Sequence, residues 1–115
     1  MNAHKVRDYC LTFPGCTEEV QWEDHLLFKV GGKIFVLSGM ETASTYSLKC
    51  REESFNELIE LEGIIPAPYL ARNKWVQIDP TLCELKTNEI KKLIGESYDL
   101  ILNKLPKKVQ ATIKQ

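Results

Sequence analysis

The sequence predicts a single α+β domain over residues 1–115, with helices packed on an antiparallel sheet of about five strands. Three observations support this fold class. The chain is 115 residues long, with 43% hydrophobic and 27% charged residues, which suits one globular domain. Apolar residues switch between helical and strand spacing in the order α-βββ-α-ββ-α. Short connections join the first three strands, which favours antiparallel pairing.

Three segments have the spacing of helices. Asn2 is suited to cap the first helix, which ends by Pro14. Residues 52–62 form the second, before a glycine. Thr87 is expected to cap the third, and its apolar stripe continues to Leu105. A glycine inside this last helix costs about 1 kcal/mol relative to alanine and could bend it.

The clearest local signal is a β-hairpin at Gly31-Gly32, because both glycines tolerate the positive φ of a two-residue type I′ turn. One apolar face follows from the expected register, which pairs Val30 with Lys33, Phe28 with Phe35 and Leu26 with Leu37. The opposite face is mixed and holds Leu27, Lys29, Ile34 and Val36.

The remaining strands are shorter. Residues 45–50 alternate as a half-buried strand, and residues 64–65 and 75–78 supply the last two. The acidic stretch 18–24 is interpreted as a connector containing at most a short extended piece. Residues 69–73 form a loop or a single turn.

Charge is segregated although the formal net charge is only −1. Residues 52–62 contain five acidic residues and no base, whereas residues 63–78 contain Arg72 and Lys74 and no acid. Residues 25–51 carry four bases and one acid. A uniformly basic coat is excluded, but nucleic-acid binding depends on charge at the contact. Ordinary solvated lysines are the simpler interpretation.

Two basic segments invite a functional interpretation. Lys33 lies at the hairpin tip, where it would reach a phosphate backbone. Arg72 and Lys74 lie beside Trp75, a mixture suited to phosphate contact and base stacking, although a core position for Trp75 is the simpler expectation. Four C-terminal lysines suit a helix C-terminus, with an accessory arm on nucleic acid as the alternative: Lys104, Lys107, Lys108 and Lys114.

No catalytic, metal or cofactor motif stands out. The cysteines at positions 10, 16, 50 and 83 lack C-x-x-C spacing, so we expect reduced thiols and no metal site. His4 or His25 could act as a base beside a cysteine, but no local motif supports this. The sequence therefore predicts a protein that is not an enzyme and carries no cofactor.

The N-terminal residues lack the apolar stretch of a signal peptide, and no window is apolar enough to span a membrane. We therefore expect a cytoplasmic location and no membrane partner.

Several short motifs, in order, resemble the MmcQ/YjbR family of small bacterial proteins over nearly the whole chain. They are Tyr9-Cys10 with Phe13-Pro14-Gly15, Lys29-Val30-Gly31-Gly32-Lys33 with Phe35, Ser47-Leu48-Lys49, Pro68-Tyr69-Leu70 through Lys74-Trp75-Val76, Ser97-Tyr98, and Lys104-Leu105-Pro106-Lys107. Two positions depart from the family pattern: Ile34 replaces a frequent methionine, and Lys74 replaces a frequent histidine.

This resemblance implies a CyaY-like, or secretion-chaperone-like, fold and a double-wing DNA-binding motif. The candidates that it carries over are Lys33, Lys49, Lys74 and Trp75. Charge and position add Lys29 and Arg72.

Three hypotheses follow. The first is a non-enzymatic DNA-binding protein that contacts the phosphate backbone through the basic hairpin and the loop before Trp75. The second is a protein-interaction module that uses the same sheet, motivated by the mixed face of the hairpin. The third is a small enzyme or ligand binder with a pocket near His25, Tyr69 or a cysteine.

Overall fold

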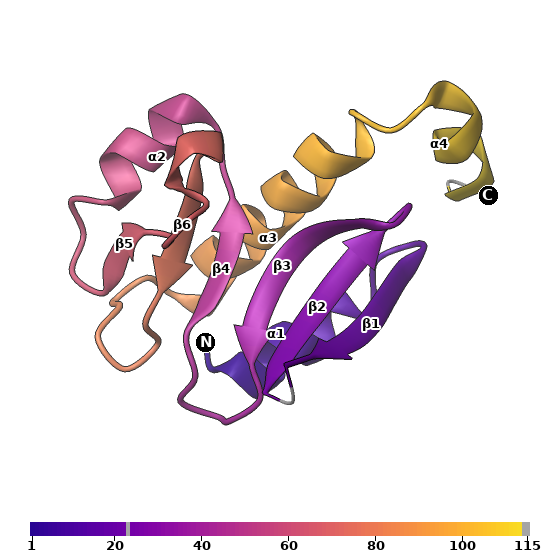
Figure 1. Ribbon diagram of the computed structural model, residues 1–115. Helices are drawn as coiled ribbons and strands as arrows, with labels where there is room; N and C mark the ends of the chain where they lie inside the picture. Colours follow the sequence, from indigo (N-terminus) through magenta and orange to yellow (C-terminus); the bar gives the residue numbers. More distant parts are fainter. Residues whose placement is uncertain (23, 114–115) are drawn as a thin grey trace.

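The computed structural model describes residues 1–22 and 24–113, and its helices and strands alternate along the chain (Figure 1). The helices are α1 (Ala3–Cys10), α2 (Glu52–Leu58), the short 3-10 helix η1 (Ala71–Asn73), α3 (Thr87–Leu102) and α4 (Lys107–Ile113). The strands are β1 (Cys16–Gln21), β2 (His25–Val30), β3 (Lys33–Gly39), β4 (Tyr46–Lys49), β5 (Ile64–Pro66) and β6 (Trp75–Ile78).

The strands form one antiparallel sheet in the order β1-β2-β3-β4-β6-β5. The α+β class and the helices on the sheet are confirmed, but the count of about five strands was one too few. The additional strand is β1, which pairs with β2 from Cys16 to Gln21, so the expectation of a connector there was wrong. Its acidic side chains are compatible with a strand because β1 is an edge strand whose four central residues are exposed.

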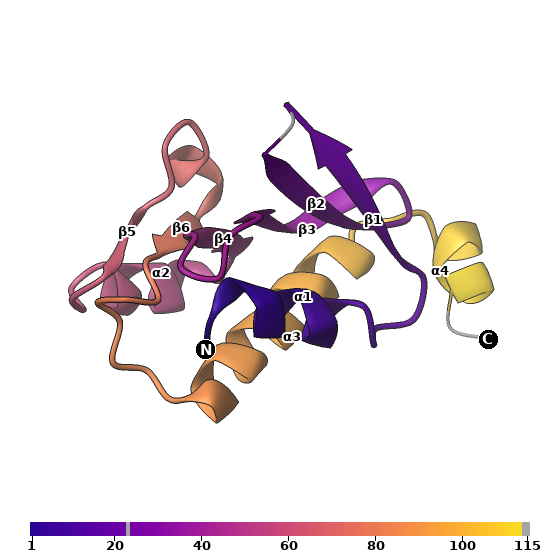
Figure 2. The same ribbon diagram turned by 90° about the horizontal axis from the view of Figure 1, so that it is seen from below.

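The helices α1, α2 and α3 lie on one side of the sheet, and its other face carries no α-helix among the described residues (Figure 2). The core lies between these layers. Phe28, Phe35 and Tyr46 are the largest fully buried side chains from the sheet, and Ile90 and Ile94 contribute from α3. Burial of each of these apolar side chains stabilises the folded state by about 1.5–3 kcal/mol.

Several helix ends differ from expectation by a few residues. The Asn2 cap is confirmed, since its side chain accepts a hydrogen bond from the Lys5 amide at 2.9 Å. Helix α2 already ends at Leu58. Lys86 rather than Thr87 is the cap of α3, and Glu89 accepts a hydrogen bond from its amide at 3.1 Å. The expected long third helix ends at Leu102, and a separate α4 follows Pro106. The glycine inside α3 does not interrupt the helix.

A β-bulge changes the expected register of the hairpin. Val30 pairs with Lys33 as predicted, but the register then shifts, and Phe28 pairs with Val36 instead of Phe35. Leu26 accordingly pairs with Ser38 and not with Leu37. The physical reason is packing, because the bulge lets the adjacent Phe35 and Val36 both become fully buried, which a regular strand does not allow on one face.

The Ser97 hydroxyl on α3 joins the bulge to the neighbouring strand. It donates to the Phe35 carbonyl oxygen at 2.6 Å and accepts from the Lys49 amide at 3.0 Å. The pairing of β3 with β4 stops at Val36 and Leu48, just before this point. The buried hydroxyl therefore satisfies two backbone groups where the strands part.

Replacing Ser97 with alanine should lower the free energy of unfolding by about 3 kcal/mol, because two buried backbone groups lose their partner. Urea unfolding followed by circular dichroism measures this. Ser38→Ala is the matched control, since this buried hydroxyl bonds only to the adjacent Gly39 carbonyl, and it should cost about 1 kcal/mol or less. Equal losses in both variants would contradict the bridging role.

The two turn glycines should differ in their tolerance of alanine. Both have positive φ, 57° at Gly31 and 81° at Gly32, so each Ala variant should lose about 1–2 kcal/mol. Only at Gly31 would the new Cβ lie 2.5 Å from Leu105 Cδ1, which should add about 1–3 kcal/mol of overpacking. Thermal unfolding of the two variants tests this, and a Gly32→Ala variant as unstable as Gly31→Ala would disprove the contact with Leu105.

Candidate nucleic-acid interface

Antiparallel pairing brings the predicted cations to one end of the sheet. Lys33 is the first residue of β3, Lys49 is the last of β4, and Lys74 directly precedes β6. In an antiparallel pair, one strand begins where its neighbour ends. These three positions therefore lie at the same end of the sheet although they are far apart in sequence. Lys29 lies near that end too, one residue before β2 finishes.

Lys49 and the adjacent Cys50 connect the end of β4 to the η1 segment. The Lys49 Nζ donates to the Asn73 carbonyl oxygen at 2.5 Å, and the Cys50 amide donates to the Lys74 carbonyl oxygen at 2.9 Å. Both contacts hold the η1 segment against the end of β4. Burial lowers the pKa of Lys49, and the positive charge of Lys104 lowers it further. Lys104 is therefore an electrostatic neighbour of Lys49.

Lys104 also links Lys49 to the hairpin. Lys33 and Lys104 line one small hollow of about 230 Å³, together with Ile34, Ile101 and Leu105. The sequence singled out Lys104 only as one of four C-terminal lysines, because its neighbours depend on how α3 docks on the sheet. Of the other three, Lys107 and Lys108 are exposed on α4, and Lys114 lies outside the described residues. We call Lys33, Lys49, Arg72, Lys74 and Lys104 the basic end.

Lys74 and Arg72 present their charges differently. Arg72 is exposed on η1. Lys74 has a positive φ of 64°, and its Nζ lies 5.0 Å from the centre of the Phe55 ring. This cation–π contact leaves the ammonium unneutralised while it orients the side chain.

Lys29 differs from the members of the basic end because it is neutralised. Its Nζ lies 2.6 Å from a Glu19 carboxylate oxygen across the β1–β2 pair. The other ion pairs among the described residues join Arg7 to Glu18 and Arg51 to Glu96, and the Asp24 carboxylate lies within hydrogen-bond distance of His25. Within residues 1–22 and 24–113, no member of the basic end has a carboxylate within ion-pair distance.

The aromatic candidate Trp75 lies in register with Lys49, but only 7% of its surface is exposed. Its ring therefore offers no free face for stacking on a base. The most exposed aromatic side chains described are Trp22 and Tyr69, at 73% and 103%. Sequence reasoning did not select them for stacking, since exposure of an aromatic ring in a turn leaves no periodic signal.

Only one of the two glycines at the hairpin tip contacts the rest of the protein. Gly31 packs against the Leu105 side chain, whereas Gly32 faces open space. The segment between β5 and β6, which contains η1, rises from the face of the sheet that carries no α-helix (Figure 2). The two basic segments thus share an end of the sheet but differ in how far they project.

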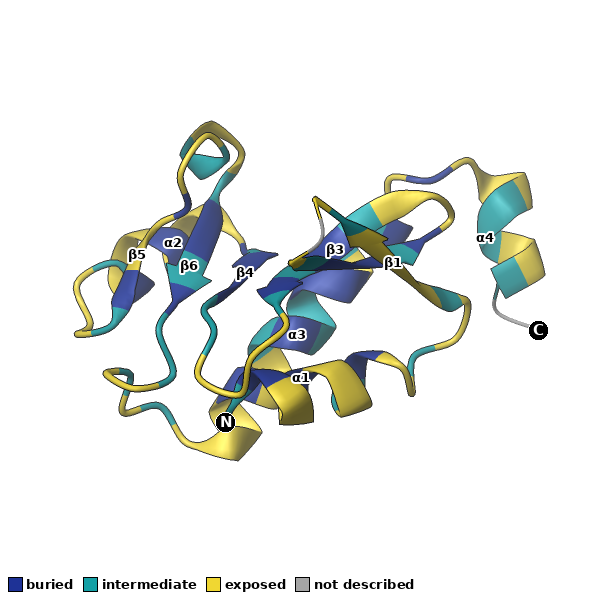
Figure 3. Cartoon of the chain, turned by 60° about the horizontal axis from the view of Figure 1, so that its bottom comes forward, coloured by how far each residue is buried: buried dark blue, intermediate teal, exposed yellow. Residues whose placement is uncertain are grey.

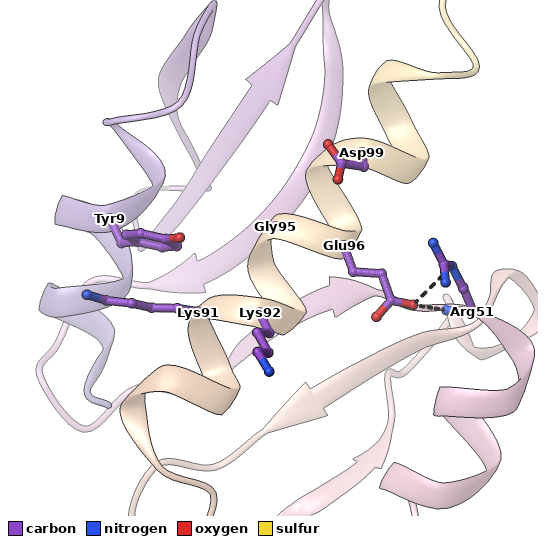
Figure 4. Close-up of a pocket in the computed structure, with 7 residues that line it drawn as sticks. All are labelled: Tyr9, Arg51, Lys91, Lys92, Gly95, Glu96 and Asp99. Carbon is purple, nitrogen blue, oxygen red and sulfur yellow. Dashed lines mark hydrogen bonds and ion pairs between the residues drawn. The ribbon is translucent and has the colours of Figure 1, made fainter.

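The cationic surface of the basic end does not continue onto the helix layer. A shallow hollow of about 400 Å³ there has both cationic and anionic side chains in its lining (Figure 4). The residues that line it are Tyr9, Arg51, Lys91, Lys92, Gly95, Glu96 and Asp99. Glu96 accepts a hydrogen bond from the Arg51 amide at 3.0 Å and pairs with its guanidinium. Since Glu52 and Glu53 then begin α2, the cationic surface is bounded on this side.

Burial favours the protonated form of three cysteine thiols. Burial raises the pKa of Cys16 and of Cys50 to about 11, and it raises the pKa of Cys10 as well. His25 Nδ1 lies 2.7 Å from an Asp24 carboxylate oxygen, on the exterior. No three candidate metal ligands come together in the part of the chain that the structure describes. None of the described helices combines the length and apolar character that crossing a membrane requires.

The fold defines a small α+β protein whose α1, α2 and α3 helices cover one side of the sheet (Figure 2). A family model described as YjbR matches residues 11–100, so the chain belongs to the YjbR family. The family resemblance predicted from the sequence is thereby confirmed. No curated protein matches the chain significantly.

Solved structures share the fold. A crystal structure of a Deinococcus radiodurans protein, described as a DUF419 domain, has a TM-score of 0.81 at 23% identity and covers 96% of this chain and 86% of its own. A crystal structure of a Pseudomonas syringae protein has a TM-score of 0.73 at 23% identity and covers 88% and 99%. These likenesses establish the fold.

The coupling of Lys49 to Lys104 is directly measurable. Lys104→Gln removes a nearby positive charge, so the pKa of Lys49 should rise toward its ordinary value, although burial keeps it lowered. Titration of the lysine Cε resonances by NMR reports this change. Lys108→Gln on α4 is the control and should leave the Lys49 pKa unchanged. An unaltered Lys49 pKa in Lys104→Gln would contradict the proximity of the two ammonium groups.

Proposed function

We propose that the protein is a non-enzymatic DNA-binding protein of the cytoplasm that contacts the phosphate backbone with its basic end. The observation that supports this most directly is the meeting of cations from β3, β4, the η1 segment and the end of α3 without carboxylate partners among the described residues. Phosphate oxygens are the natural counter-charge for such a surface.

Two further features fit this proposal. Lys49 and Lys74 are held by contacts with a carbonyl oxygen and an aromatic ring, so their ammonium positions are restricted before binding. The buried Trp75 and the neutralised Lys29 leave recognition to phosphate contacts. Binding should therefore depend little on base sequence.

The salt dependence of binding tests the proposal. With four or five phosphates engaged, log K for a fluorescein-labelled 20-base-pair duplex should fall with log salt at a slope of about −4, because each contact releases a counterion. Fluorescence anisotropy between about 50 and 200 mM salt gives this slope. The double variant Lys33→Glu/Arg72→Glu should flatten the slope by about 2 and weaken binding throughout the range.

The control is a variant with the same change in net charge on the helix layer. Lys5→Glu/Lys92→Glu alters two exposed lysines on α1 and α3, and it should leave most of the affinity and slope intact. Absence of binding at low salt would refute DNA binding. Equal losses in the two double variants would show that the basic end has no special role.

A further inference from the structure

A groove crosses the face of the sheet that carries no α-helix, and none of its lining residues belongs to the basic end. Its volume is about 630 Å³, within the range of ligand sites. Leu37, Ser47 and Gln77 supply its floor from β3, β4 and β6, where Ser47 pairs with both neighbours. Figure 3 shows the β1–β2 hairpin and the segment before β6 rising on either side of this face.

The charge of the groove is opposite to that of the basic end. The chain contains 15 lysine and arginine residues, but none of the residues that line the groove is a lysine or an arginine. Its carboxylates are Asp24, from the turn between β1 and β2, and Glu41, from the loop after β3. One oxygen of Asp24 already lies 2.7 Å from His25 Nδ1, and His25 also lines the groove. Both lie at the end of the sheet away from Lys33 and Lys49. The site therefore favours a cation.

Two exposed aromatic side chains flank the groove. Tyr69 lines one wall, and the Trp22 ring makes an edge contact with His25 of the other wall, with 5.7 Å between ring centres. Both residues have positive φ, 66° at Tyr69 and 54° at Trp22. A positive φ at a residue other than glycine strains the backbone, and such strain is typical of functional sites. Burial of the two rings does not offset this strain, because both are exposed. Aromatic faces bind guanidinium and ammonium groups.

The floor offers hydrogen-bonding groups of both kinds. Gln77 Nε2 of β6 donates to Oγ1 of Thr45, the residue before β4, at 3.0 Å, which holds the amide in place. A side-chain amide and a hydroxyl can each donate and accept. A peptide matches this floor because its backbone supplies both donors and acceptors, whereas a polyamine supplies donors alone.

We propose that this groove binds an extended peptide segment of a partner protein that carries arginine or lysine. The basic side chain enters beside Asp24 and Glu41, an aromatic face of Tyr69 covers it, and the peptide backbone bonds to the polar floor. This site is independent of the proposed DNA-binding function, because the two surfaces share no residue.

The test uses the peptide acetyl-Ala-Arg-Ala-Arg-Ala-amide in a ¹H–¹⁵N NMR titration of the full chain, without DNA. Shift changes should cluster at the amides of Thr45, Ser47, Gln77 and Tyr69, and the same peptide with glutamate in place of arginine should produce none. Asp24→Asn/Glu41→Gln should weaken binding at least fivefold, and Tyr69→Ala should weaken it about threefold.

Two control variants show whether binding depends on the groove itself. Glu52→Gln/Glu53→Gln removes the same charge from α2 and should leave peptide affinity unchanged, as should Lys33→Glu/Arg72→Glu at the basic end. The spectra of all variants report whether the fold is intact.

Three results would overturn the proposal. The first is the absence of shift changes at about 5 mM peptide, which corresponds to binding weaker than about −3 kcal/mol. The second is a set of shift changes clustered outside the groove. The third is equal binding of spermidine with the same pattern of shift changes, which would identify a polyamine site.

Discussion

The hydroxyl of Ser97 is the contact on which the geometry of this molecule depends. It occupies the point where β3 and β4 separate, and it bonds to the Phe35 carbonyl of one strand and the Lys49 amide of the other. A continued ladder would hold Lys49 against β3. With the hydroxyl inserted, α3 is fixed to both strands, and the end of α3 brings Lys104 to Lys33 and Lys49. These two hydrogen bonds thus fix α3 against the strands that carry Lys33 and Lys49.

Antiparallel topology explains how one small sheet presents two surfaces of opposite charge. Strand ends alternate, so the hairpin turn, the end of β4 and the start of β6 share one end, which is cationic. The β1–β2 turn and the β3–β4 loop share the other end, which contributes Asp24 and Glu41 to the groove. The near-zero net charge hides this division. The same arrangement makes it possible to alter either surface without disturbing the other.

Local chemistry made much of the fold predictable, because a Gly-Gly turn, a helix cap and apolar periodicity act within a few residues. The turn at Gly31-Gly32 and the Asn2 cap followed from such signals. Strand β1 did not, since an exposed, acidic edge strand lacks alternation. The bulge near Phe35 and the position of Lys104 depend on how α3 packs, which is a non-local property. For the site, cations next to strand ends were visible in the sequence, but the Lys29–Glu19 pair was not.

The proposed DNA binding requires that cations from distant segments act together as one anion-binding surface. Mapping a 20-base-pair duplex onto the ¹⁵N-labelled protein by NMR tests it most directly, because each backbone amide reports its own surroundings. Shift changes should concentrate at the amides of Lys33, Lys49, Lys74 and Lys104, and they should spare α1 and the groove. Changes centred on the helix layer, or on the Asp24 turn, would contradict it.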